Sequence, residues 1–178
     1  SNDSQVLFEY GLLEQRAERP ADAIRYLAKA GNVQRVDPNP GLALIDLYLN
    51  QHQGDLALTA AKELAGKFST NLKVQLALAK TYLTNGAASD ARTVLTGATR
   101  LAEFDPKSQV AIARMQLAAA NPDGAAYSVH KALQGNAGDV AALALAVQVE
   151  ARRGDLAKAD SALKALSAKY PAAIETAR

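Results

Sequence analysis

Apolar residues recur along this chain with the spacing of helices rather than of strands. Between Tyr10 and Ala30 they fall at three- and four-residue intervals, which is the repeat of one helical face, in two runs on either side of Pro20. Pro20 suits the first turn of a helix, where its missing N–H costs little. This stretch therefore predicts two short helices that fold back on each other.

The small residue of the second run, Ala23, has counterparts further along the chain. We assign them to Ala60, Ala91, Ala126 and Ala159, which gives unequal steps with a mean of about 34 residues. When the second unit is aligned on Ala60, its turn Gly54-Asp55 comes one residue earlier than the repeat pattern expects. We prefer Ala60 because an alignment on the glycine would turn Asp46 into the packing face.

Arg114 raises a similar question in the fourth unit, because it falls near the expected packing face. Two explanations are open. Either the stem of Arg114 lies along the core with its charged head in solvent, or the helical register assigned here is off by one residue.

This period divides the chain into about five helix–turn–helix units within one domain spanning 1–178. The expected units are 4–39, 40–71, 72–106, 107–139 and 140–171, and residues 172–178 begin a truncated sixth unit that caps the last apolar face. Each unit of such an array buries its apolar face only against its neighbours. The predicted fold class is all-α.

These units resemble the tetratricopeptide repeat, a helix–turn–helix motif with the same period. The resemblance rests on Tyr10-Gly11, on the small-large-small stripe Ala23, Leu27 and Ala30, on the aromatic Tyr82, on the turns Gly54-Asp55 and Gly154-Asp155, and on Pro171. It implies a right-handed superhelical solenoid that binds a protein or peptide on its concave face. The Ala- and Leu-rich style of the repeats is similar to periplasmic arrays of bacterial exopolysaccharide and PEP-CTERM-type export lipoproteins. That likeness implies a periplasmic or cell-envelope location, with the cytoplasm as the alternative.

Composition and charge narrow the class of partner. Alanine and leucine dominate the 49% of hydrophobic residues, which favours short, closely stacked helices. The net charge of +2 and the scattered basic residues give no footprint for nucleic acid. No apolar stretch is long enough to span a bilayer, and the absence of cysteine excludes disulfides and thiolate sites. Ser1-Asn2 is typical of a tag-removal scar, so we expect a segment of a longer protein.

No catalytic or metal-binding constellation is evident. His52 and His130 lie in different units without a second ligand at metal-binding spacing. His52 is predicted to be a solvated residue at a helix end, and His130 a packing residue. There is no Gly-rich phosphate loop and no Gly-x-Ser-x-Gly elbow. The chain is predicted not to be an enzyme and to carry no cofactor or metal.

A partner-binding wall is expected on the first helix of each unit, where the resemblance places the concave groove. The predicted site residues are Phe8, Leu12, Gln15, Arg16, Ile45, Leu49, Lys73, Lys80, Thr84, Met115, Gln148 and Arg152. For each of them burial in the core is the alternative, since an error of one position turns a residue by about 100° around the helix. Phe8, Ile45 and Leu76 occupy sites where chaperone-binding relatives carry lysine, which disfavours that function.

The sequence thus leads to two functional hypotheses. The first is a non-catalytic scaffold that binds a protein or peptide partner on the concave face, as part of a bacterial polysaccharide or protein export system. The second is a structural spacer or self-association module, in which apolar positions of the terminal repeats pack against further repeats or another copy.

Overall fold

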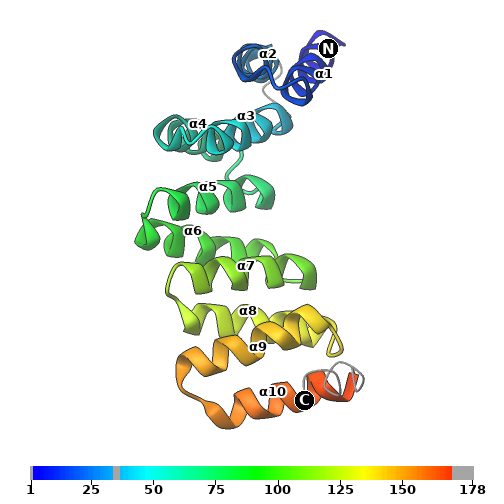
Figure 1. The fold of residues 1–178 in the computed structure, drawn as a ribbon, viewed down its shortest axis with the longest axis vertical. Coiled ribbons are helices and arrows are strands. Elements are labelled where there is room, and N and C mark those ends of the chain that lie inside the picture. Colours follow the sequence, from blue (N-terminus) through cyan, green and yellow to red (C-terminus); the bar gives the residue numbers. More distant parts are fainter. Residues whose placement is uncertain (1, 34–36, 170–178) are drawn as a thin grey trace. The chain divides into compact units, whose positions relative to one another are not determined.

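The computed structural model describes residues 2–33 and 37–169, and this part of the chain is built from helices alone (Figure 1). Its fold belongs to the all-α helical-repeat class, as the sequence predicts. Pro171 and residues 172–178, for which a capping role is expected, lie outside the described residues.

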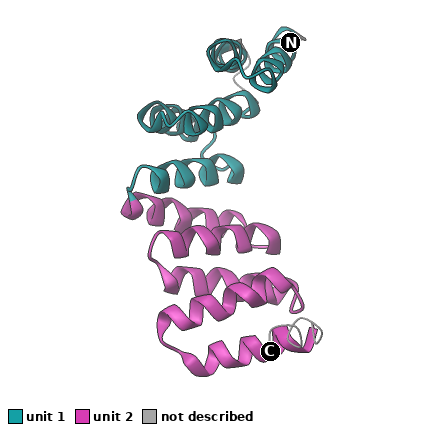
Figure 2. Cartoon of the chain, in the orientation of Figure 1, with its two compact units in different colours: residues 1–87 teal, residues 88–178 magenta. Residues whose placement is uncertain are grey.

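The chain forms two compact units, Ser1–Ala87 and Ala88–Arg178 (Figure 2). Unit 1 contains α1 (Asn2–Arg16), α2 (Pro20–Val33), α3 (Asn39–Asn50), α4 (Gly54–Lys67) and α5 (Leu72–Thr84). Unit 2 contains α6 (Ala88–Leu101), α7 (Pro106–Ala118), α8 (Pro122–Gly135), α9 (Val140–Arg153) and α10 (Leu156–Lys169). Within each unit every helix packs against the next one along the chain.

Polar side chains at the helix starts fix where several helices begin. The side-chain oxygens of Asn71, Asp105, Asn121 and Asp139 accept hydrogen bonds from backbone N–H groups in the first turns of α5, α7, α8 and α9. Each such bond satisfies an N–H that has no partner within the helix. Asn121 with Pro122 is therefore a cap followed by a proline in the first turn, which makes a sharp start for α8.

One buried alanine on the second helix of every pair sets the repeat. These alanines are 8% exposed or less and follow one another at equal intervals: Ala23, Ala57, Ala91, Ala125 and Ala159. The assignments to Ala60 and Ala126 are wrong. Gly54 is the first residue of α4 and Pro122 that of α8, so the buried position three residues later falls on Ala57 and Ala125.

The reason for preferring Ala60 also fails. In the register of the buried alanines Asp46 is exposed, and Ile45 is the neighbour that turns into the core with 1% exposure. The same shift decides between the two explanations for Arg114. Its side chain is exposed while Ala113 is buried, so the expected register was off by one residue.

Gly11 allows the closest approach within the first helix pair. A Cβ atom at this position would lie 2.7 Å from Leu27 Cγ, a distance that real Cβ contacts do not reach. The absence of a side chain at Gly11 therefore lets α1 and α2 pack closely. In unit 1 Leu27 then joins Ala23 and Leu47 in a buried cluster, against which Phe8 packs.

Unit 2 contains a buried polar network among its apolar side chains. Ser128 Oγ donates to Gln116 Oε1 at 2.9 Å, and Gln116 Nε2 lies 3.4 Å from Thr99 Oγ1. Gln109 Nε2 donates to the carbonyl oxygens of Thr99 at 2.9 Å and Ala102 at 3.1 Å. Buried polar groups are costly without such partners, so the network ties α6, α7 and α8 to one arrangement.

The register of the buried alanines predicts that Ala57→Leu destabilises the protein more than Ala60→Leu does. Ala57 is fully buried, whereas Ala60 is half-buried beside open space. Overpacking a tight contact costs about 1–3 kcal/mol in the free energy of unfolding. Urea denaturation followed by circular dichroism measures both variants. An equal or larger loss for Ala60→Leu would contradict the register.

The cap of α7 predicts a pH-dependent contribution to stability. Hydrogen bonds from the side chain and backbone of Ser108, and then from the backbone of Lys107, hold the pKa of Asp105 below its ordinary value. The stabilisation from the carboxylate is therefore present above the unfolded pKa of about 3.9 and is lost as the pH falls through the lower folded pKa.

We expect Asp105→Ala to cost about 1 kcal/mol near neutral pH. Asp105→Asn is the matched control, because its amide oxygen can still cap the helix but does not titrate in this range. Thermal melts over a range of pH should show the difference between the native protein and Asp105→Asn disappearing in acid. A difference that stays constant with pH would exclude this role for the carboxylate.

Candidate partner-binding face

An ion pair shows that the first helices of two neighbouring repeats expose side chains on the same side of unit 1. In unit 1 Lys80 Nζ on α5 lies 2.7 Å from Asp46 Oδ1 on α3, and the two residues are 34 positions apart. Both side chains are exposed. The equivalent positions on these two first helices therefore project onto one common surface of unit 1.

We call the surface that carries Leu12, Asp46 and Lys80 the unit 1 face. The residues one and two repeats after Lys80 are Arg114 on α7 and Gln148 on α9, both exposed. We call the surface that they mark the unit 2 face.

The predicted site residues fall into three groups by exposure. The exposed ones are Arg16, Lys73, Lys80, Thr84, Gln148 and Arg152. The half-buried ones are Phe8, Leu12, Gln15, Leu49 and Met115. One, Ile45, is buried.

Ile45 is a correction to the predicted wall, because it lies in the core and offers no surface to a partner. Its neighbour Asp46 takes the surface position. The prediction of Met115 is also off by one position, because Arg114 is the residue equivalent to Lys80. For the remaining residues, the assignment to a binding wall stays a prediction.

Asp46 and Arg114 are absent from the predicted wall, and both lie in repeats where more than one helical register fits the sequence. A signal for them is present in the sequence. The predicted wall residues Leu12, Lys80 and Gln148 are spaced two repeats apart, and the midpoints between them are Asp46 and Arg114.

Both faces carry exposed cations. On the unit 1 face the ammonium of Lys80 is neutralised by Asp46, whereas Lys73, two helical turns earlier on α5, forms no ion pair with a described residue. On α7, Lys107 and Arg114 are exposed and lie two helical turns apart, so they share one side of that helix. Neither they nor Arg152 in the last turn of α9 forms an ion pair with any residue that the structure describes. The unit 2 face is therefore cationic.

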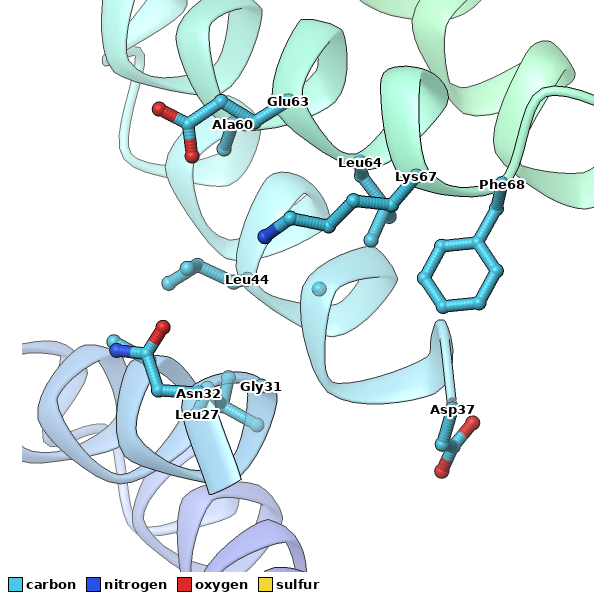
Figure 3. A pocket seen from close by; sticks show the side chains of 12 residues that line it. Leu27, Gly31, Asn32, Asp37, Leu44, Ala60, Glu63, Leu64, Lys67 and Phe68 are labelled. Carbon is cyan, nitrogen blue, oxygen red and sulfur yellow. The ribbon is translucent and has the colours of Figure 1, made fainter. Parts of the chain in front are cut away.

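A cavity of about 220 Å³ lies elsewhere, between α2, α3 and α4 of unit 1. Figure 3 shows Leu27, Leu44 and Leu64 around it, with the charged ends of Glu63 and Lys67 nearby. None of the predicted site residues lines this cavity. It is smaller than the roughly 300–1,000 Å³ of most small-molecule sites, so the first-helix faces remain the better candidates.

The described residues hold no cluster of three or more His, Cys, Asp or Glu side chains that could bind a metal ion. His52 is exposed and has a left-handed backbone with φ 57°, at the end of α3. His130 is also exposed, with its Nε2 3.0 Å from Gln134 Nε2, so the prediction that it packs in the core is wrong. None of the helices in the described ranges is long and apolar enough to cross a membrane.

Solved structures with the same arrangement of helices are tetratricopeptide repeat proteins. One from Parabacteroides merdae ATCC 43184 superposes with a TM-score of 0.76 at 15% identity, over 97% of this chain and 68% of its own. TTC0263, from Thermus thermophilus, gives 0.61 at 17% identity, over 97% and 94% of the two chains. The chain has the tetratricopeptide-repeat fold.

A further solved structure shares this fold. YrrB, described as a tetratricopeptide repeat protein with an unusual peptide-binding site, superposes with a TM-score of 0.69 at 14% identity, over 93% of this chain and 86% of its own. No family model matches the sequence, and no curated protein matches it.

Proposed function

We propose that this chain is a non-catalytic scaffold that binds an extended segment of a protein partner on a first-helix face. The observation that carries the proposal is the presence, within each unit, of exposed side chains at equivalent positions of its first helices: Asp46 and Lys80 in unit 1, which form an ion pair, and Arg114 and Gln148 in unit 2. A surface that repeats with the helices offers an extended chain similar contacts at regular intervals. The peptide-binding site of YrrB supports the same use of the fold.

The charge of the unit 2 face indicates the chemistry of the partner segment. Lys107, Arg114 and Arg152 present positive charges, and half-buried Met115 and Ala144 add apolar surface on the same two helices. Hydrogen bonds between guanidinium and carboxylate groups are stronger than those between neutral groups. An extended segment with both acidic and apolar residues fits this face.

We further propose that the scaffold works in the bacterial cell envelope, in polysaccharide or protein export. The support is the Ala- and Leu-rich style of its repeats, which resembles periplasmic export lipoproteins, and a composition without cysteine, which is compatible with an oxidising compartment.

Self-association is the second candidate function. It is favoured by large apolar side chains exposed on the first and last helices: Val6, Tyr10 and Leu13 on α1, and Leu156 and Leu163 on α10. In this case the chain acts as a spacer or assembly module, and the surfaces of its terminal helices matter more than the first-helix faces.

Binding of an acidic peptide should depend on the cations of the unit 2 face. The probe is a fluorescein-labelled peptide of alternating Glu and Leu, titrated with the protein and followed by fluorescence polarisation. Arg114→Glu replaces attraction by repulsion and should weaken binding by about tenfold, or about 1.4 kcal/mol. Added salt should weaken binding by the native protein, since exposed charges are screened.

The matched control is Arg92→Glu, which makes the same change at an exposed position on α6, a second helix. It should bind like the native protein. A peptide with Lys in place of Glu controls for apolar contacts alone. Equal losses in the two variants, or equal affinity for the acidic and basic peptides, would show that the unit 2 face is not the binding site.

The envelope proposal predicts where the protein is found in its source cells. Antibody detection after fractionation should find it with the periplasm or the membranes, together with markers of those compartments. Recovery with the cytosolic marker alone would refute the location but leave the peptide-binding proposal open.

A further inference from the structure

The cavity of about 220 Å³ between α2, α3 and α4 has an apolar floor, and we call it the unit 1 cavity. Leu27, Leu44 and Leu64 line it, one from each of these helices (Figure 3). Gly31 on α2 keeps the space open, since a Cβ atom there would meet no atom of another helix closer than Pro40 Cβ at 4.0 Å. Apolar cavities bind apolar groups in preference to water.

Unit 2 carries larger side chains at equivalent positions. The unit 1 cavity is lined in part by small residues, which are Gly31, Gly41 and Ala60. Two repeats later the chain has larger polar residues, all of them buried: Thr99, Gln109 and Ser128. They belong to the buried polar network of that unit. A hollow on the same helices of unit 2 is lined by residues that include neither a leucine nor a carboxylate. The unit 1 cavity is therefore not a general feature of the repeat.

The mouth of the unit 1 cavity carries opposite charges that do not pair with each other. Glu63 and Lys67 both line the cavity and lie one helical turn apart on α4, a spacing at which such residues often pair. Neither forms an ion pair with any residue that the structure describes. In Figure 3 the side chain of Lys67 extends from α4 over the mouth, with Asn32 of α2 across from it.

The other acidic group of the lining, Asp37, is already engaged. Its Oδ1 accepts a hydrogen bond from the backbone N–H of Asn39 at 2.9 Å, at the start of α3. Glu63 and Lys67 are exposed, so both charges remain available to a ligand.

These groups define a ligand with three parts. The leucine side chains of the floor favour a branched aliphatic group. Lys67 and Asn32 offer N–H donors to a carboxylate, and Glu63 offers a carboxylate to an ammonium group. Hydrogen bonds between charged groups are stronger than those between neutral ones. An α-amino acid with an aliphatic side chain carries all three parts on one carbon atom, and it is smaller than the drug-sized ligands that fill larger pockets.

We propose that the unit 1 cavity binds a free aliphatic α-amino acid such as leucine. The side chain of the ligand lies among Leu27, Leu44 and Leu64, its carboxylate faces Lys67, and its ammonium group faces Glu63. The ligand contacts both α2 and α4, so its binding stabilises the packing of the first helix pair against the second. The site is independent of peptide binding on the first-helix faces, because none of the predicted wall residues lines this cavity.

Isothermal titration calorimetry of the full chain with L-leucine tests the site. The native protein should bind one leucine with a dissociation constant of roughly 0.1–1 mM, because so small a ligand makes few contacts. Leucinamide lacks the carboxylate and N-acetyl-leucine lacks the ammonium group, so each should bind about tenfold more weakly or worse. Glycine lacks the aliphatic group and should give no measurable binding.

A pair of glycine variants tests the place of binding. Gly31→Leu puts a side chain into the cavity and should abolish leucine binding. Gly66→Leu is the matched control, because Gly66 lies on α4 outside the lining and a Cβ atom there has no neighbour within 4 Å. It should bind leucine like the native protein. Leucine is a better helix former than glycine, so both variants should fold, and circular dichroism checks this.

A pair of lysine variants tests the recognition of the carboxylate. Lys67→Gln should weaken leucine binding by about tenfold. Lys29→Gln makes the same change at an exposed position of α2 that does not line the cavity, and it should have no effect.

Absence of leucine binding by the native protein would overturn the proposal, and so would a folded Gly31→Leu variant that binds as before. N-acetyl-leucine bound as tightly as leucine would assign the cavity to the carboxyl end of a peptide, and leucinamide bound as tightly would assign it to an amino end. Either result would refute a site for the free amino acid. The acidic-peptide titration of Gly31→Leu should match that of the native protein, which separates this site from the first-helix faces.

Discussion

A small buried residue at the same place in the second helix of each pair is the constraint on which the rest of the structure depends. The second helix of each pair has one such alanine three residues after its first residue. All five alanines recur at equal intervals. A methyl group lets two helix backbones approach closely, and a larger side chain would push them apart. The same interval then carries over to the first helices, which is why Asp46 and Lys80 meet across neighbouring repeats.

The sequence predicts the helical-repeat class and the average period correctly, but it misplaces two of the five buried alanines. The cause is the composition. Around Ala57 the chain also has Ala60 and Ala61, and Ala125 is followed by Ala126, so several positions are small enough to be the contact. Only the helix start distinguishes them. Gly54 is typical of a turn, whereas in the structure it is the first residue of α4.

The same ambiguity limits the prediction of the candidate site. Lys80 and Arg152 lie in repeats where the register is clear, and both side chains are exposed as expected. In the second repeat a shift of one residue exchanges Asp46 for Ile45, a charged surface residue for a core residue. Ion pairs between repeats depend on both registers at once. The pairing of Asp46 with Lys80 therefore could not be predicted from either helix alone.

The uniform spacing of the buried alanines also bears on how such a chain can change in length during evolution. Loss or duplication of one full repeat joins each helix to an equivalent neighbour, and the alanine contact is kept. An insertion of one or two residues inside a helix rotates the later side chains of that helix by about 100° per residue, away from their contacts. Repeat number can therefore vary in whole steps, while small insertions are confined to the turns between helices.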